Sequence, residues 1–418
     1  MHNRSRLAKT QLGDICSFAS GTGFKEALQG NRAGAYPFIK VSDLNLEENQ
    51  KWIKTSNNWI DEAARKELRA VLHPANSVVF AKVGAALKLN KRRLLARPTA
   101  IDNNLMAAVP NENRVLPEYL YYFLQTKDLG RLCQDGAVPS VNQTHLSAIP
   151  IDLPNLVEQA RVVDVLRVWD GAIDKMALLV RAKEKCVRGM LSDCVSDARG
   201  TVGRDGWKKT TLGEVARIVS RRVVWDEQAT YRRITVKRGC GGLVFREDRK
   251  GHEILTKDMY TVHAGDFVIS KRQVVHGAWA MALPEFDGAH VSKEYACLEA
   301  KPDQLWMPYL DWLSRTDRLR HEALICSYGV DIEKMVLNVD WLLQTPLLLP
   351  RSIDAQKAMV AALDSLQREV NLLCRQLEAL RRQRRGLRQL LFATGREEIV
   401  LDGQAGEAAT RVTEEAAQ

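Results

Sequence analysis

The sequence predicts an α+β protein in which two similar domains are separated by two long helices that form an antiparallel coiled coil, with a pseudo-two-fold internal repeat. Three observations predict this fold: a set of motifs occurs twice in the same order, a proline pair follows each set, and a ladder of apolar residues follows each pair. A chain of 418 residues has room for two to three domains.

The repeat begins with short motifs. "LGDI" at Leu12–Ile15 returns as "LGEV" at Leu212–Val215, and "ANSVVFAK" at Ala75–Lys82 returns as "AGDFVISK" at Ala264–Lys271. The latter pair are β-branched runs that end in lysine, and both predict strands. A period of about 190 to 200 residues is too long for a solenoid and indicates two similar domains.

Each half continues with a short helix and a proline pair. "LPEYLYYFLQT" (residues 116–126) returns as "MPYLDWLSRT" (307–316), and in both a proline lies in the first turn, where the missing N–H costs nothing. "IPIDLP" (149–154) returns as "TPLLLP" (345–350). Proline disfavours helix in the residue before it, so each pair ends a domain and leads into the following helix.

The two ladders have the alternating spacing of four and three that is typical of a coiled-coil seam. Lys183 and Arg384 interrupt them, and two ordinary core helices are the alternative interpretation. The predicted seam consists of Val162, Leu166, Trp169, Ile173, Met176, Val180, Val187, Leu363, Leu366, Val370, Leu373, Leu377, Leu380 and Leu387.

These signals give the domain boundaries. The first domain is predicted over residues 1–152, the first long helix over 153–198, the second domain over 199–348 and the second long helix over 349–396. The remaining tail, 397–418, is poor in apolar residues and is predicted to be disordered.

Composition narrows the class of protein. Hydrophobic residues make up 45% and charged residues 27%, and no apolar run is long enough to span a bilayer or to act as a secretion signal, so we expect a cytoplasmic protein without membrane contact. The eight cysteines include no C-x-x-C pair, which argues against zinc and favours free thiols. Phosphate-loop, dinucleotide-binding and nucleophile-elbow motifs are absent. We therefore expect no enzymatic activity and no cofactor.

Charge points to a polyanionic partner. Lysine and arginine number 61 against 51 acidic residues, for a net charge of +10. Basic runs follow the repeated strands, where loops would carry recognition residues, although solvated charge is the alternative for any single residue. The candidate DNA contacts are Lys82, Lys88, Asn90, Lys91, Arg92, Arg93, Arg221, Arg222, Arg232, Arg233, Lys237, Arg238, Lys271, Arg272 and Gln273.

"RRQRRGLR" at Arg381–Arg388 lies near the end of the second ladder. Two interpretations stay open for it. The cations complement the negative end of the helix dipole, or they face DNA.

These pieces together resemble the specificity subunit of type I restriction-modification systems. The resemblance rests on "LGDICSFASGTGF" (12–24), "YPFIKVSDLN" (36–45), "SVVFAKVGA" (77–85), "PEYLYYFL" (117–124) and "GAVPSVNQTHLSAIPIDLPNLVEQARVVDVL" (136–166), and more loosely on "LGEVARIVS", "GDFVISK" and "TPLLLPRSIDAQKAMVAALD" in the second half. It covers nearly all of residues 10–398.

The resemblance implies that both domains are target recognition domains, each reading one half of a split DNA site. The helices would set the gap between half-sites and dock two methyltransferase subunits, and motor-nuclease subunits would join them. Double-stranded DNA would be the ligand of this chain. S-adenosylmethionine, ATP and Mg²⁺ would be bound by the partner subunits, where catalysis would also reside.

The second half departs from the family pattern at "YGVDIEKMVLN" (328–338), where no counterpart of "GAVPSVN" is found. Divergence of the two domains predicts an asymmetric target. Three rival interpretations remain. The first is the specificity portion of another restriction type or of a different phage-defence methylation system. The others are a coiled-coil scaffold that joins two protein-binding domains without specific DNA binding, and a cryptic nuclease.

Overall fold

The computed structural model describes residues 8–132, 140–195 and 206–393. The predicted tail, most of the connection between the first helix and the second domain, and most of "GAVPSVN" lie outside these residues. Among the described residues, no helix is long and apolar enough to cross a membrane.

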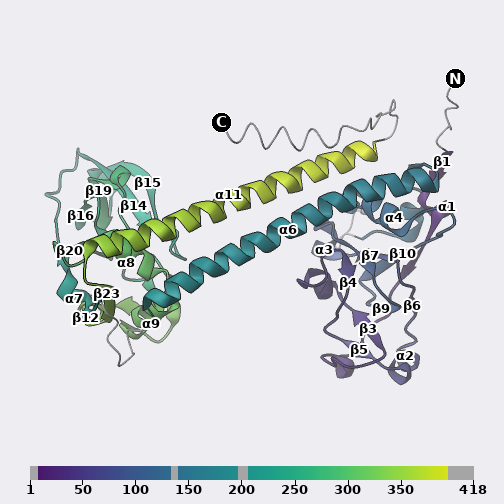
Figure 1. Cartoon of the computed structure of the whole chain (residues 1–418), viewed down its shortest axis with the longest axis horizontal. Coiled ribbons are helices and arrows are strands. Elements are labelled where there is room, and N and C mark those ends of the chain that lie inside the picture. The colour runs from purple at the N-terminus through teal and green to yellow at the C-terminus, as the bar shows by residue number, and fades with distance from the viewer. Residues whose placement is uncertain (1–7, 133–139, 196–205, 394–418) are drawn as a thin grey trace. The chain divides into compact units, whose positions relative to one another are not determined.

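The chain divides into two compact units, and each long helix contributes to both. Unit 1 comprises Met1–Lys175 and Glu378–Gln418, and unit 2 comprises Met176–Leu377. In Figure 1 the domain of unit 1 is purple to blue and that of unit 2 is teal to green.

Unit 1 contains two main sheets and a two-stranded one. Its strands are β1 (Ala8–Gln11), β2 (Cys16–Ser20), β3 (Tyr36–Ile39), β4 (Trp52–Ile53), β5 (Trp59–Ile60), β6 (Leu72–His73), β7 (Val78–Ala81), β8 (Arg92–Leu95), β9 (Thr99–Ile101), β10 (Leu105–Pro110) and β11 (Pro150–Leu153). Its helices are α1 (Leu12–Ile15), α2 (Glu62–Leu68), α3 (Gly84–Lys88), α4 (Pro117–Leu124), α5 (Gln143–Ser147) and the first half of α6 (Leu156–Val195).

Unit 2 contains the same kinds of element. Its strands are β12 (Trp207–Thr211), β13 (Ala216–Val219), β14 (Thr230–Val236), β15 (Leu243–Lys250), β16 (Met259–Val262), β17 (Phe267–Ser270), β18 (Trp279–Met281), β19 (Ala289–Ser292), β20 (Tyr295–Ala300), β21 (Ser327–Tyr328), β22 (Val336–Leu337) and β23 (Pro346–Pro350). Its helices are α7 (Leu212–Val215), α8 (Met307–Ser314), α9 (Asp317–Ile325), α10 (Val339–Leu343) and most of α11 (Ile353–Leu391).

The sheets of the two units have equivalent topologies. The order β2-β10-β7-β8 in unit 1 matches β13-β20-β17-β18 in unit 2, and β5-β3-β9-β6 matches β15-β14-β19-β16. Even the one parallel pairing in the latter sheets recurs, between β3 and β9 and between β14 and β19. The strand pairs β1-β11 and β12-β23 close the two units in the same way. The predicted internal repeat and fold class are therefore confirmed.

The predicted strands and short helices form where the sequence places them. Strands β7 and β17 are wholly buried, and three of the four residues in each are β-branched or aromatic. Helices α4 and α8 both carry proline in the first turn. The place that lacks a counterpart of "GAVPSVN" in sequence still has the same backbone bond, since Val141 N–H donates to Lys82 O at 3.0 Å and Leu337 N–H to Lys271 O at 2.8 Å.

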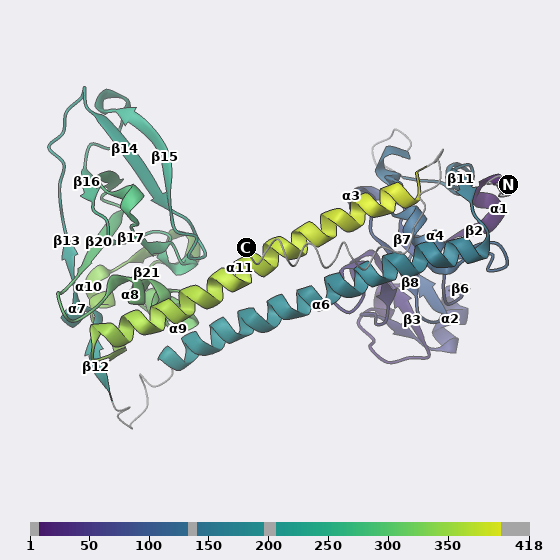
Figure 2. The ribbon, with the colours of Figure 1, turned by 45° about the horizontal axis from the view of Figure 1, so that its top comes forward.

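Within each unit, segments of α6 and α11 lie side by side and run antiparallel (Figure 2). An ion pair links them in each case: Lys183 with Glu369 at 2.8 Å in unit 2, and Asp170 with Arg384 at 2.6 Å in unit 1. Glu158 and Asp354 lie in the first turns of α6 and α11, where the helix dipole favours negative charge.

The predicted seam residues differ in burial. Leu166, Val180, Val187, Leu363, Val370 and Leu377 are buried, whereas Val162, Trp169, Ile173, Met176, Leu366, Leu373, Leu380 and Leu387 are half-buried. Val163 and Leu191, which the ladder omits, are buried as well. Both pack into the hydrophobic core of their unit, so each helix serves the domain beside it as well as the other helix.

A buried glutamine joins each helix start to its domain. Gln159 is fully buried; its Oε1 accepts from Leu116 N–H at 2.8 Å, and its Nε2 donates to Arg114 O and Pro154 O, both at 2.9 Å. Gln356 makes the equivalent three bonds in unit 2, to Trp306 N–H at 2.8 Å, Gln304 O at 3.3 Å and Pro350 O at 3.2 Å. Buried backbone groups need such partners, so this one side chain fixes helix entry in both units.

Candidate nucleic-acid interface

The strand-ending lysines occupy equivalent places in the two units. Lys82 N–H donates to Asn104 O, and Lys271 N–H to Glu294 O, both at 2.9 Å. Both side chains are half-buried, and Lys82 Nζ donates to Ser20 Oγ at 2.9 Å. The structure thus places one predicted cation directly after the equivalent strand, β7 or β17, in each unit.

The first basic run is not the exposed loop that the sequence predicts. It forms α3 and β8, and β8 is buried along its whole length between β7 and β4. Arg92 is only 1% exposed and Arg93 9%. Arg92 donates to Lys127 O at 2.9 Å and Arg93 to Leu44 O at 2.9 Å. Burial lowers the pKa of the Arg92 guanidinium to about 10.

Arg92 therefore does not offer its guanidinium group to a phosphate in this conformation, and Arg93 is held by bonds to two backbone carbonyls. Asn90 is also engaged internally: in the left-handed region at φ 52°, it donates to Asp128 Oδ1 at 2.7 Å and accepts from Leu129 N–H at 3.1 Å. Lys88 is exposed, and Lys91 is half-buried with its ammonium bonded to Asn45 Oδ1. These two lysines are the members of the run that lie nearest to solvent.

Several predicted cations of unit 2 are paired within the protein. Arg221 makes two bonds to the buried carboxylate of Asp266, at 2.6 and 3.2 Å, and this partner raises the pKa of Arg221. Arg222 lies 3.2 Å from Asp258 and remains largely exposed. Arg221 is thus part of the framework of unit 2, whereas Arg222 stays accessible.

A second group of candidates forms a polar cluster at the surface of unit 2. Arg238 donates to Gln273 Oε1 at 2.7 Å and to Glu333 Oε2 at 2.6 Å, and Arg272 donates to Glu294 at 2.5 Å. Lys237 is exposed beside them. The cluster joins two predicted runs that are far apart in sequence.

The β14–β15 hairpin holds the remaining candidates and adds cations that sequence reasoning missed. Arg232 is exposed, with its guanidinium 5.3 Å from the ring centre of Phe245, and Arg233 lies 3.5 Å from Glu247. Strand β15 carries Arg246 and Arg249, and the charged run "REDRK" (246–250) was the available signal. A basic, two-stranded ribbon is a shape that enters a DNA groove.

A cavity of about 370 Å³ lies against this hairpin, lined by Arg233, Arg246, Arg249, His290 and Tyr295 among others. Burial, followed by the charge of Arg246, lowers the pKa of Arg233, and burial lowers the pKa of His290. Unit 1 has no such long hairpin among its described residues, because β3 and β5 are four and two residues long. The four-stranded sheets β5-β3-β9-β6 and β15-β14-β19-β16, which we call the outer sheets, thus differ in strand length between the two units.

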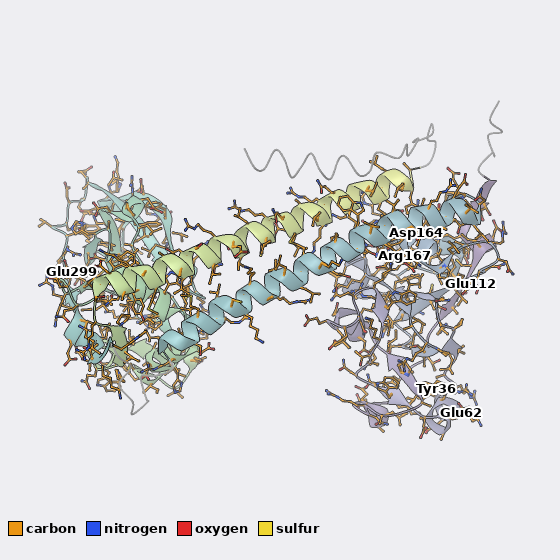
Figure 3. The ribbon with its side chains drawn as sticks, in the orientation of Figure 1. Tyr36, Glu62, Glu112, Asp164, Arg167 and Glu299 are labelled. Carbon is orange, nitrogen blue, oxygen red and sulfur yellow. The ribbon has the colours of Figure 1, made fainter. Side chains whose placement is uncertain are left out.

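An ionic network in unit 1, also missed from sequence, ties its domain to α6. Lys51 Nζ donates to Glu118 at 2.6 Å and to Tyr122 Oη at 2.7 Å, and lies 3.3 Å from Asp170. Arg167 reaches the same Glu118 at 2.6 Å. It also pairs with Asp164 on its own helix, and Figure 3 labels both of these residues on α6. No group of metal ligands is found among the described residues.

Two copies of one α+β domain, each packed on segments of two long helices, define a class of proteins with an internally duplicated architecture. Residues 6–180 match the family model described as the type I restriction modification DNA specificity domain. The predicted resemblance to type I specificity subunits is thereby confirmed.

Individual relatives agree with the family model. The chain is 27% identical over 165 residues to the type I restriction enzyme EcoR124I/EcoR124II specificity subunit of Escherichia coli, which covers 38% of this chain and 40% of that protein. The alignments to curated relatives span between 40% and 61% of those proteins, about half their length.

Solved structures share the fold over most of the chain. The type I restriction-modification S subunit from M. genitalium has a TM-score of 0.53 at 14% identity and covers 95% of this chain and 99% of its own. A structure from work on assembly and conformational transition of the type I R-M system has a TM-score of 0.61 at 15% identity, with coverage of 94% and 99%.

Proposed function

We propose that this chain is the non-catalytic DNA-recognition subunit of a type I restriction-modification complex, in which each unit reads one half of a split, asymmetric site. The observation that carries the proposal is that two units of equivalent topology differ in their outer sheets, where unit 2 has the basic β14–β15 hairpin. A shared framework with different reading elements is what two different half-sites require.

The long helices would set the gap and dock two methyltransferase subunits, to which motor-nuclease subunits would bind. Support comes from large apolar side chains that lie exposed on them: Val168 is 72% exposed, Leu178 59% and Leu372 57%. Exposed apolar side chains of this size favour a protein partner. S-adenosylmethionine would then belong to the methyltransferase, and ATP and Mg²⁺ to the motor subunit, in the cytoplasm.

The decisive experiment is genome-wide adenine methylation by long-read sequencing in cells with and without this gene beside its methyltransferase partner. We expect a split, asymmetric motif that disappears when the gene is deleted. An unchanged methylation pattern in cells that express the complex would favour a scaffold of two protein-binding domains instead.

The role of the helices as a spacer has its own test. Removal of residues 176–182 from α6 and 371–377 from α11 deletes one facing heptad from each helix and shortens the pair by about 10 Å. The methylated motif should keep both half-sites while the gap shortens by about 3 base pairs. A changed half-site sequence, or an unchanged gap in an active complex, would contradict the spacer role.

A further inference from the structure

A basic cavity of about 420 Å³ lies in unit 1, between the domain and the segments of α6 and α11 that belong to this unit. Six cations line it: Lys51, Arg93, Arg381, Arg384, Arg385 and Arg388. Two carboxylates, Asp170 and Asp174, also line it, so cations exceed carboxylates by four. We call it the arginine cavity.

The carboxylates neutralise only part of this charge. Asp170 is shared between Arg384 at 2.6 Å and Lys51 at 3.3 Å. Arg388 donates to the neutral amide of Gln125. Burial, and next the positive charge of Arg384, lower the pKa of Arg388 to about 10. The cations therefore repel one another, and a bound anion would relieve that repulsion.

Donor atoms in the cavity wall also lack protein partners. Arg93 is 9% exposed, and its Nε has no hydrogen-bond partner; the buried Nε of Arg388 has none either. Buried donors of charged groups are costly when unsatisfied. The outer rim, Arg381 and Arg385, is exposed and adds charge where a ligand would enter.

The corresponding place in unit 2 is apolar. The offset of 197 residues that relates Gln159 to Gln356 relates Val187 to Arg384 and Leu191 to Arg388. Val187 and Leu191 are 7% and 8% exposed and belong to the hydrophobic core of unit 2. Unit 2 thus completes its core without arginines at these positions. The ion pair of Arg384 with Asp170 accounts for one of the two arginines in unit 1, and the remaining excess of positive charge calls for an anionic ligand.

We propose that the arginine cavity is a binding site for phosphate groups, supplied by a DNA backbone or by a free oligophosphate. Planar guanidinium groups bind phosphate oxygens in pairs, and clustered arginines are the usual receptors for them. The lining tyrosine, Tyr121, is 3% exposed and offers no face on which a base could stack, which favours phosphate over nucleobase. The site does not depend on which DNA sequence the units read.

The test is binding of inorganic tripolyphosphate to the full-length chain by calorimetry at low ionic strength. We expect saturable binding that Arg381→Gln/Arg385→Gln weakens by at least about tenfold, because two cations next to a polyvalent anion are lost. Arg375→Gln/Arg382→Gln is the matched control, since both residues are exposed on α11 and neither lines the cavity. It should change the affinity by less than about twofold.

A gain-of-affinity variant guards against misfolding as an explanation. Asp174 is an exposed carboxylate of the lining, and Asp174→Asn should tighten tripolyphosphate binding by about two- to threefold. Absence of saturable binding to the wild-type chain, or an equal loss in the control double variant, would overturn the proposal.

Competition identifies the source of the phosphates. If a random-sequence duplex displaces tripolyphosphate, and Arg381→Gln/Arg385→Gln lowers the salt dependence of DNA affinity by about one to two counterions, the ligand is the DNA backbone. If tripolyphosphate remains bound beside DNA, the ligand is a free oligophosphate. Both results support the site, and neither depends on the methylation motif that tests the proposed function.

Discussion

Units 1 and 2 build the same domain but finish their helices in different ways. Both begin the helix with a buried glutamine that makes three backbone hydrogen bonds. The C-terminal part of α6 belongs to unit 2, where Val187 and Leu191 are buried in the core. The C-terminal part of α11 belongs to unit 1, where Arg384 and Arg388 line a cavity. The two units thus share the interactions that hold the fold and differ at the surface that we propose to bind phosphate.

The outer sheets of the two units also share their strand order and differ in strand length and exposed charge. In unit 2, β14 and β15 are seven and eight residues long and carry exposed arginines, whereas β3 and β5 of unit 1 are short. Strand order and the parallel pairing in these sheets are nonetheless equivalent. Element length and side-chain identity thus vary more freely than strand order, because strand order fixes the core.

The largest effect on stability should come from exchanging the side chains that differ between the two helix ends. Val187→Arg/Leu191→Arg places two charges in the core of unit 2 and should destabilise that unit by at least about 5 kcal/mol, since neither charge has a buried partner there. Unit-resolved hydrogen exchange would show loss of protection in 206–350 while residues 8–132 stay protected. Retained protection in unit 2 would mean that its core admits charge, and the comparison of helix ends would fail.

The reverse exchange is the control for that prediction. Arg384→Val/Arg388→Leu should change the stability of unit 1 by less than about 1.5 kcal/mol, because Asp170 keeps Lys51 and the Tyr122 hydroxyl as partners. The same variant should lose tripolyphosphate binding. One exchange adds two cations to the core of unit 2 and the other removes two cations from the cavity of unit 1, so together they separate packing from ligand binding.

Substitution of the buried glutamine at the start of either long helix should have the next largest effect on stability. Gln159→Ala leaves one backbone N–H and two carbonyls of unit 1 without their buried partner and should cost about 3 kcal/mol. Gln356→Ala should cost less, because its bonds to Gln304 O and Pro350 O are longer, at 3.3 and 3.2 Å.

Thermal unfolding followed separately in the two units measures this difference. Gln376→Ala, at an exposed position of α11, is the control and should change the unfolding free energy by less than about 0.5 kcal/mol. A loss below about 1 kcal/mol for Gln159→Ala would show that water replaces the amide and that the glutamine does not fix helix entry.

Local sequence patterns were enough to predict the repeated elements, but they did not predict the contacts between those elements. The motifs at Leu12–Ile15 and Leu212–Val215, strands β7 and β17, and both long helices follow from periodicity, proline position and repetition, which are properties of neighbouring residues. Gln159 and Gln356 read as ordinary surface positions of a helix, because only the folded domain supplies the backbone groups that they bind. A pattern of residues on one helix does not report what another segment brings to it.

The basic run at Lys88–Arg93 is the clearest failure of local reasoning. Charge density predicts a solvated loop, yet β8 lies inside a five-stranded sheet, where Lys127 O and Leu44 O accept from its arginines. The arginine cavity escaped prediction for the same reason. Its cations come from residues 51, 93 and 381–388, which are distant in sequence and adjacent in unit 1.

Substitutions in the β14–β15 hairpin should have an effect of intermediate size on DNA binding. Arg232→Ala/Arg246→Ala removes two exposed cations of the hairpin and should weaken binding to the methylated motif about tenfold, with a salt dependence lower by about two counterions. Lys88→Ala/Lys91→Ala in unit 1 should weaken it about threefold, because Lys91 already bonds Asn45.

Fluorescence anisotropy over a series of salt concentrations gives both quantities. Lys357→Ala/Arg368→Ala removes the same charge from exposed positions of α11 and serves as the control. Equal losses in all three double variants would mean that net charge alone determines the affinity, and the hairpin would then have no special role.

The smallest expected effect concerns pH and distinguishes the two units by a buried histidine. His73 in unit 1 is 2% exposed, its Nε2 has no hydrogen-bond partner, and burial lowers its pKa below the ordinary value of 6.5. The unfolded chain therefore binds the proton more readily than the folded one. The stability that neutral His73 provides is complete above pH 6.5 and is lost as the pH falls below it.

At pH 5.5, one unit below that value, the loss of stability cannot exceed about 1.4 kcal/mol. His73→Gln should remove this part of the pH dependence of unit 1 between pH 7.5 and 5.5, whereas His145→Gln, at an exposed position of α5, should leave it unchanged. An identical pH dependence in wild type and His73→Gln would mean that the histidine is protonated within the fold, and carboxylates would then account for any acid sensitivity of unit 1.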